Sequence, residues 1–288
     1  MPISKSKKTS SGLLQLTSRW GGWPLTTSPS NGRTEHTCGL EIILLLTVNA
    51  LNTKMNLNAD LSVKLVIDAN ELPWETSPIP GVDRKLLDRI GDEFGKATSI
   101  IQYAPDSSYC EHKLTGGEEI LVLSGIFSDE SGNYPAGSYL RNSPTSSHMP
   151  FSKDGCTLFV KHRHFHPDDQ DSVRINIRTS TWYQGLVPGL SVMPLDDFEE
   201  VSTALVKWES NTIFNPHVHP GGEEIFVLEG IFHDEHGSYT VGTWIRSPRH
   251  SRHAPFTKSE GAVIYVKTGH LDYPLPQVIQ GIQLTFAH

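Results

Sequence analysis

The stretch of sequence that decides the fold is His217-Val218-His219-Pro220-Gly221-Gly222-Glu223-Glu224-Ile225-Phe226-Val227-Leu228. Two histidines in alternation, a Pro-Gly-Gly turn and an apolar run are typical of a short strand, a tight turn and a buried strand. Because alternate side chains of a strand lie on one face, we expect His217 and His219 to point the same way. With His253 further along the chain, the stretch offers three imidazoles and a carboxylate, a donor set typical of a metal site.

Two neighbouring glutamates compete for the carboxylate position of this site. We expect Glu223 rather than Glu224 to face the histidines, because Glu223 has the same parity along the chain as the two histidines. Three imidazoles that face one another without a metal would leave polar groups unpaired, at roughly 1–3 kcal/mol for each group. A hydrogen-bonded cluster without a metal is the alternative, and we favour the metal site.

The donor set suits zinc, iron, manganese or copper, and ligand type alone does not choose among them. Zinc would be held tetrahedrally by the four side chains. Iron or manganese would keep one or two positions open for water, oxygen or a chelating substrate. We expect one divalent metal here, zinc or iron ahead of manganese.

A second, altered copy of the stretch lies upstream. An offset of 105 residues places His112 on His217, Gly116-Gly117-Glu118-Glu119 on Gly221-Gly222-Glu223-Glu224, and His148 on His253. About half of the residues paired between His112 and Lys153 are identical, which indicates a tandem duplication. The repeat predicts two similar domains, which we name module 1 (residues 55–170) and module 2 (residues 171–288).

The copy in module 1 lacks one histidine, because Leu114 stands where module 2 has His219. Its remaining candidate ligands are His112, Glu118 and His148, a two-histidine, one-carboxylate set of the kind that holds iron(II) with open positions. Cys110 and Glu111 are candidates for a substitute ligand, although a loop role suits both better. Two alternatives stay open for module 1: an altered second metal site, or a module kept for packing alone.

Composition restricts the class of protein. A chain of 288 residues with 37% hydrophobic content can bury two modest cores, and its net charge of −8 comes without clustered Lys and Arg, so we expect no nucleic-acid partner. Three cysteines without a Cys-x-x-Cys pair favour the cytoplasm. The longest apolar run, Ile42 to Leu46 with flanks to Leu51, is too short to span a bilayer, so we expect no membrane association.

Residues 1–54 do not belong to the repeat. They carry a net charge of +4, which leaves −12 for the rest of the chain. Met55 opens a segment that leads directly into module 1, so we interpret residues 1–54 as a disordered extension or as a stretch upstream of the true start at Met55. A targeting or amphipathic extension is the alternative.

Short apolar runs separated by turn residues dominate both modules. The runs Ile120–Leu123 and Ile225–Leu228 are followed by glycines, and Asp-Glu-x-Gly turns follow at Asp129 and Asp234. Regular short strands with glycine-rich turns predict an all-β sandwich or barrel. We expect helix only over residues 84–94 and 194–201.

Two further groups of residues have a structural and a functional interpretation. Arg141 and Arg246 occupy equivalent positions, where they could orient an anionic ligand, and we favour structural pairs with Asp129 or Asp234. The histidines His162, His164 and His166 resemble a metal patch. Only His164 has a counterpart in the other repeat, at His270, so we interpret the three as solvated surface.

The spacing of His217, His219, Glu223 and Gly230 resembles the first motif of the cupin superfamily, and Gly242 with His253 resembles the second. The Gly-Gly-Glu-Glu-Ile run, the Asp-Glu-x-Gly turn and a tryptophan followed by Pro-Gly are most similar to the ChrR-like cupins, over nearly everything after residue 68. The resemblance implies two tandem cupin jelly-roll barrels, each a double-stranded β-helix.

The ChrR-like cupins include acetylacetone-cleaving dioxygenases and the cupin domain of an anti-sigma factor. The resemblance therefore implies a metal-dependent oxygenase that acts on a small carbonyl or diketone compound bound through oxygen to the metal of module 2. Members that cleave acetylacetone rely on histidines alone, so Glu223 departs from their pattern. No catalytic residue beyond the metal ligands is evident.

Two other classes stay open. A regulatory sensor would fit the anti-sigma resemblance, but the zinc-binding His-x-x-x-Cys-x-x-Cys signature that grips a sigma factor is absent from the sequence, so we expect no sigma-factor partner. A storage or small-molecule-binding module without chemistry is the third class. Cupin barrels often pair through their outer sheets, so by analogy we expect a homodimer.

Overall fold

The computed structural model describes residues 56–93 and 95–271 of the chain. Every regular element within these ranges is a β-strand, so the all-β prediction is confirmed. The same residues contain no helix that is long and apolar enough to cross a membrane. The extension over residues 1–54, the start at Met55 and the apolar run from Ile42 lie outside the described residues.

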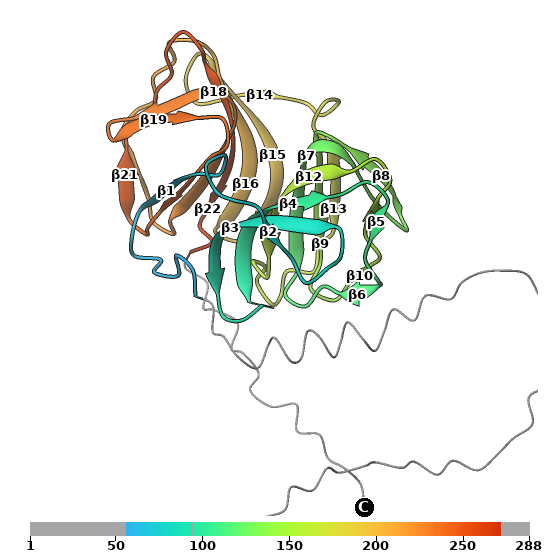
Figure 1. Ribbon diagram of the computed structural model, residues 1–288. Helices are drawn as coiled ribbons and strands as arrows, with labels where there is room; N and C mark the ends of the chain where they lie inside the picture. The colour runs from blue at the N-terminus through green and yellow to red at the C-terminus, as the bar shows by residue number, and fades with distance from the viewer. Residues whose placement is uncertain (1–55, 94, 272–288) are drawn as a thin grey trace, which may run out of the picture. The chain divides into compact units, whose positions relative to one another are not determined.

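Two large antiparallel sheets make up most of the fold (Figure 1). The main strands of the module 1 sheet are, in spatial order, β13 (Val173–Asn176), β9 (Ser138–Asn142), β7 (Glu118–Asp129), β12 (Cys156–His162), β4 (Lys96–Tyr103), β3 (Val82–Ile90) and β2 (Glu75–Thr76). The short strands β5 (Ser107–Ser108), β8 (Gly132–Pro135) and β11 (Phe151–Ser152) attach to this sheet, whereas β6 (His112–Lys113) and β10 (Ser147–His148) form a separate two-stranded sheet.

The module 2 sheet repeats this plan. Its main strands are, in spatial order, β1 (Leu65–Asp68), β20 (Thr243–Ser247), β18 (Glu223–Asp234), β22 (Ala262–Thr268), β16 (Val201–Trp208), β15 (Leu190–Phe198) and β14 (Tyr183–Gln184). The short strand β19 (Gly237–Thr240) pairs with β18, whereas β17 (His217–His219) and β21 (Ser251–His253) form a separate two-stranded sheet.

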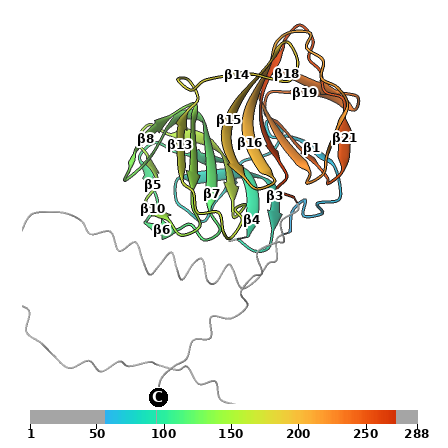
Figure 2. The same cartoon turned by 180° about the vertical axis from the view of Figure 1, so that it is seen from behind.

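Each module lends its first strand to the sheet of the other. β1 pairs with β20 of module 2, with Leu65 opposite Arg246. β13, the first strand after residue 170, pairs with β9 of module 1, with Val173 opposite Arg141. Figures 1 and 2 show β1 beside the orange strands and β13 among the green ones. Main-chain hydrogen bonds therefore join the two modules as well as side-chain contacts.

Alternation along the central strand of each sheet separates the interior of a barrel from the interface between the modules. In β18, Ile225 and Val227 pack into the core of module 2, whereas Phe226 packs into a core that both modules share. The Phe226 ring stacks on Phe159 of module 1, with ring centroids 4.7 Å apart and an interplanar angle of 14°. Because side chains alternate along a strand, one residue step decides between the two environments.

Buried ion pairs cross the interface on these outer faces. Lys161 contacts Glu224, and Lys267 contacts Glu119, so the same pair occurs twice with the modules exchanged. All four side chains are at most 2% exposed. Each ammonium is also within hydrogen-bond distance of a threonine hydroxyl, at 3.0 Å for Thr98 and 3.1 Å for Thr203. These extra contacts matter because a buried charge needs several partners to offset its lost hydration.

Arg141 and Arg246 form structural pairs, but their partners are not the aspartates predicted from the sequence, Asp129 and Asp234. Arg141 contacts Asp169, and its Nε atom lies 3.0 Å from Asp196 Oδ2 in module 2. Arg246 Nη1 lies 2.8 Å from Asp88 Oδ2 in module 1. Asp169 belongs to module 1, whereas the contacts with Asp196 and Asp88 join the two modules, and a search for partners within one repeat could not anticipate these two.

The helices predicted over residues 84–94 and 194–201 are wrong, because these segments contribute to β3 and β15. Each strand contains an irregularity that breaks strict alternation, between Leu86 and Asp88 in β3 and between Pro194 and Asp196 in β15. In β3, Leu86 and Leu87 are consequently both buried. The resulting spacing of apolar residues imitates that of a helix, and the bulge itself depends on pairing with a distant strand.

Candidate metal centres

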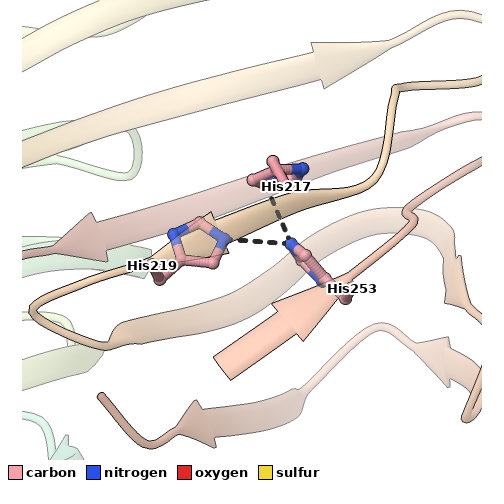
Figure 3. Close-up of side chains that lie close together, drawn as sticks. All are labelled: His217, His219 and His253. Atoms are coloured by element: carbon pink, nitrogen blue, oxygen red, sulfur yellow. Dashed lines mark hydrogen bonds between the residues drawn. The ribbon is translucent and has the colours of Figure 1, made fainter. Parts of the chain in front are cut away.

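The three histidines of module 2 come from two short strands that lie side by side. β17 carries His217 and His219, and β21 carries His253 directly opposite His217. The Nε2 atom of His253 lies 3.1 Å from the Nε2 atoms of both other rings (Figure 3). One nitrogen atom from each of the three rings lies within 4.8 Å of the other two. The strand pairing thus gathers three imidazoles around one point.

The Pro-Gly-Gly turn after β17 returns the chain toward the histidines. Gly222 has a φ angle of +78°, in the left-handed region that glycine adopts without strain. A Cβ atom at this position would lie 2.5 Å from Leu271 Cδ1, so a larger residue would have to displace that side chain. The turn leads directly into β18, whose first residue is Glu223.

Glu223 lies with the histidines, and Glu224 points into the module interface. The Glu223 Oε1 atom is 3.4 Å from His219 Nε2, and its Oε2 atom is 3.6 Å from His253 Nε2. Glu224 instead contacts Lys161 and lies 3.3 Å from His270 Nε2. The structure therefore brings together all four side chains that the sequence offers as ligands in module 2.

Burial controls the protonation of this cluster. It lowers the pKa of His219 to about 4 and that of His253 to about 3, and the neighbouring imidazoles act in the same direction. Both rings are therefore neutral at neutral pH. Burial also raises the pKa of Glu223 to about 8, with Lys64 opposing and Asp234 supporting the change. A divalent cation would replace the carboxyl proton and bind the lone pairs of neutral imidazoles.

The donors of module 2 fit a metal ion. His217 Nδ1 lies 2.9 Å from the carbonyl oxygen of Asn215, so its N–H donates there and Nε2 presents a lone pair to the cluster. A single Nε2–H on His253 cannot fully satisfy both imidazole nitrogens that it contacts. The buried Oε2 atom of Glu223 has no hydrogen-bond partner. A divalent cation among these atoms would satisfy all of them.

The cluster opens onto a largely apolar cavity of about 360 Å³. Its aromatic walls are Trp208, Phe214 and Phe232. Gln184 and Thr268 are the uncharged polar side chains of its lining, which includes no lysine or arginine among the described residues. A cavity of this kind suits a small neutral molecule better than an anion, because it offers an anion no cationic partner apart from a bound metal.

Module 1 keeps part of this arrangement. His112 and His148 lie opposite each other on β6 and β10, with ring centroids 4.7 Å apart. Glu118 Oε2 is 3.7 Å from His148 Nε2. Leu114, which replaces the second histidine, is buried and lines a cavity of about 220 Å³. His148 therefore lies near both other candidate ligands of module 1, whereas the three donors that lie within 4.8 Å of one another among the described residues are those of module 2.

The two substitute ligands considered for module 1 have other contacts. Cys110 offers its carbonyl oxygen to His112 Nδ1, at 3.1 Å. Glu111 is exposed and accepts a hydrogen bond of 2.9 Å from the Ser147 hydroxyl.

The interpretation of His162, His164 and His166 as solvated surface is wrong for His164, and the side chain of His162, 36% exposed, is only partly solvated. His162 Nε2 lies 2.9 Å from Glu118 Oε1, and His164 is only 5% exposed. His162 stands opposite Glu118 in the pairing of β12 with β7. Sequence analysis missed it because a histidine run carries no mark of its cross-strand partner. Pairing the strand that ends at His162 with the strand that begins at Glu118 could have identified this contact.

The carboxylates of the two modules differ in their charge. Burial alone would raise the pKa of Glu118. The nearby His148 and His162 lower it by more, so the pKa lies at about 2, below the usual value for a glutamate. The Asn142 amide also donates to Glu118 Oε2 at 3.2 Å. The ionised form is therefore favoured for Glu118, whereas burial favours the protonated form of Glu223.

Comparisons with known proteins agree with this architecture. Residues 62–166 and 170–272 each match the family model described as the ChrR Cupin-like domain. No curated protein matches the sequence. The predicted pair of tandem cupin barrels is confirmed.

Solved structures of other bicupins show the same fold at low sequence identity. A protein from Nostoc punctiforme described as a "putative dioxygenase" aligns with a TM-score of 0.63 and 14% identity, covering 74% of this chain and 85% of its own. A cupin 2 conserved barrel domain protein from Leptotrichia buccalis aligns at 0.52 and 15%, covering 71% and 95%. Oxalate decarboxylase from Lactobacillus farciminis aligns at 0.52 and 12%, covering 73% and 87%. At these identities the likeness shows the fold alone.

Proposed function

The chain belongs to the ChrR cupin-like family, and from this premise we propose that module 2 is a metal-dependent, dioxygenase-like enzyme that acts on a small carbonyl or diketone compound. The proposal rests on a cluster of three histidines and one glutamate that together line an apolar cavity. The metal would be held by His217, His219, Glu223 and His253.

The metal that fits this chemistry is iron, ahead of manganese. A bound iron ion would supply Lewis acidity for a carbonyl oxygen and a redox centre for dioxygen, with positions left open beside four protein ligands. Zinc would be saturated by the same four ligands in a tetrahedral site, which suits a structural or sensing role better.

The residues of the cavity would bind and orient the substrate. Phe214 packs against His217 with ring centroids 5.0 Å apart, and Phe232 lies 6.4 Å from the His253 ring. These aromatic walls exclude water and favour an apolar substrate body. Gln184 lines the cavity, and its side-chain amide would donate a hydrogen bond to a carbonyl group of the substrate. The absence of lysine and arginine from the described lining argues for a neutral compound.

The test joins metal analysis with oxygen uptake. Protein purified without an affinity tag would be analysed for metal, stripped with a chelator, reloaded with iron(II) and assayed on an oxygen electrode with acetylacetone and other small carbonyl compounds. We expect uptake by the wild type and its loss in His219→Ala. His250→Ala is the matched control, because His250 is exposed on a neighbouring loop and should leave uptake unchanged.

Two outcomes would overturn the proposal. One is wild-type protein that binds none of the candidate metals. The other is stoichiometric zinc with no oxygen uptake after iron loading, which would favour a regulatory sensor.

A further inference from the structure

The two modules place their third imidazole differently. Module 2 has His219 on β17 and Thr268 at the end of β22. Module 1 has Leu114 at the position equivalent to His219 and His162 at the position equivalent to Thr268. Thr268 lines the cavity of module 2, and His162 lines the cavity of module 1. Module 1 therefore lacks the histidine that module 2 has on β17, and it has a histidine at the end of β12 where module 2 has Thr268.

His162 is positioned by the same strand register that holds its counterpart. In module 2, Thr268 stands opposite Glu223. In module 1, His162 stands opposite Glu118, so its ring reaches Glu118 Oε1 at 2.9 Å. Side chains that are directly opposite in neighbouring strands lie on one face and about 5 Å apart at Cβ. The imidazole of His162 is therefore directed at the carboxylate, which itself approaches His148.

The ring nitrogens of His148 have no hydrogen-bond partner among the described residues and are free to bind a ligand. The side chain is 4% exposed. Its Nε2 atom faces Glu118 Oε2 at 3.7 Å, beyond hydrogen-bond distance. A buried imidazole without a partner loses roughly 1–3 kcal/mol unless another group binds it. A cation between the imidazole and the carboxylate would satisfy both.

The surroundings of the cluster are those of the complete site in module 2. His112 Nδ1 lies 3.1 Å from the carbonyl oxygen of Cys110, as His217 Nδ1 lies 2.9 Å from that of Asn215. The Nε2 atom of His112 is thereby left with a lone pair, which is the tautomer that a metal requires. Tyr109 packs on the His112 ring at 4.6 Å, as Phe214 packs on His217.

We propose that module 1 carries a second divalent-metal site of altered construction, in which His162 replaces the missing histidine. Its ligands would be His112, Glu118, His148 and His162. Their side chains would have to turn toward one point, because among the described residues the three histidines that already lie within 4.8 Å of one another are those of module 2. The site would have the same donor types as module 2, three imidazoles and a carboxylate, with its third imidazole on β12 and with Leu114 in the cavity lining in place of a histidine. This inference concerns module 1 and does not depend on the function proposed for module 2.

The experiment exchanges the two positions. The starting protein is the full chain with His217→Ala and His253→Ala, so that module 2 is silenced. Cobalt(II) and zinc(II) binding to chelator-stripped protein would be measured by equilibrium dialysis and, for cobalt, by its visible ligand-field bands. We expect one equivalent of metal in this background. His162→Thr, which installs the residue of module 2, should weaken affinity by more than about 100-fold, because even residues that only support a ligand contribute about 10–100-fold.

Restoring the module 2 arrangement provides the decisive control. Adding Leu114→His to His162→Thr returns the third imidazole to its position in module 2, and we expect affinity to recover while the cobalt bands shift. A merely structural role of His162 would give no such rescue. The same His162→Thr change with module 2 intact should reduce the total from two equivalents to one, which guards against misfolding of the silenced chain.

Two results would overturn the proposal. If the chain with module 2 intact binds at most one equivalent and His148→Ala leaves that number unchanged, module 1 holds no metal. If His162→Thr binds cobalt as tightly as its parent, His162 is not a ligand and the site is a two-histidine, one-carboxylate set.

Discussion

The ion pair between Lys161 and Glu224 provides a quantitative test of how the modules hold each other. Both side chains are 1% exposed, so Lys161→Met leaves the Glu224 carboxylate in a desolvated place without its ammonium partner. Removal of one member of such a pair costs about 3–5 kcal/mol. For a folded unit of this size, each kcal/mol of lost stability lowers the melting temperature by about 2–4 °C. We therefore expect the melting temperature of Lys161→Met to be about 6–20 °C lower than that of the wild type.

The remaining neighbour of Glu224 does not replace the ammonium. His270 Nε2 lies 3.3 Å from Glu224 Oε2, but burial lowers the pKa of His270 to about 4, so the ring is neutral at pH 7. The double variant Lys161→Met/Glu224→Leu removes both charges. It should recover most of the lost stability, because a well-packed apolar pair is often as stable as a buried ion pair.

Urea unfolding followed by circular dichroism measures these free energies. Lys267→Met is the matched variant, since Lys267 forms the symmetry-related pair with Glu119, and we expect a loss in the same range. The reasoning is refuted if Lys161→Met stays within about 1 kcal/mol of wild type, as an exposed pair would. It is equally refuted if the double variant is no more stable than the single one.

Three further predictions concern the site and its turn. Glu223→Gln should weaken zinc binding by module 2 at least about 10–100-fold, with little change in the stability of the metal-free protein. Glu224→Gln should retain zinc binding and lower the free energy of unfolding by about 3–5 kcal/mol. Equilibrium dialysis and urea unfolding separate the two effects. Chelation should lower the melting temperature by about 5–11 °C, because an ion at about 100 times its Kd contributes about 2.7 kcal/mol. Added metal should restore it in scanning fluorimetry, and an unchanged curve would contradict a bound ion. Gly222→Ala should cost more than about 1 kcal/mol because of its positive φ and its contact with a leucine. Gly132→Ala, where a Cβ would meet nothing closer than 3.8 Å, should stay within about 0.5 kcal/mol.

The part of the fold that could be predicted from the sequence depends on local periodicity and on the repeat. Alternation places His217 and His219 on one face of a strand, and the choice of Glu223 over Glu224 follows when the same parity is continued through the Pro-Gly-Gly turn, since a single residue step changes the face. The repeat extends that assignment to module 1, where it identifies His112, Glu118 and His148. These features need no knowledge of which strands lie side by side.

The part that could not be predicted depends on pairing between distant strands. In the strand exchange, β1 pairs with β20, which lies more than a hundred residues further along the chain. The bulge of β3 makes a strand look helical, because it places two consecutive leucines in the core, and β15 has a bulge at the equivalent position. His162 becomes a candidate ligand only through its register with Glu118. Each error has the same cause: the position of the side chain is decided by a neighbour that is remote in sequence.

The differences between the modules follow the two faces of their central strands. On the face that meets the other module, one charged pair is kept in both modules: Glu119 contacts Lys267, and Glu224 contacts Lys161. On the face that lines the cavity, Leu114 and His162 differ from their counterparts. Module 1 cannot be removed without exposing the buried charges and the shared core of module 2, whatever chemistry its own cavity has. The interface therefore keeps two barrels together while their inner faces are free to differ, and the two candidate metal sites need not bind the same ligand.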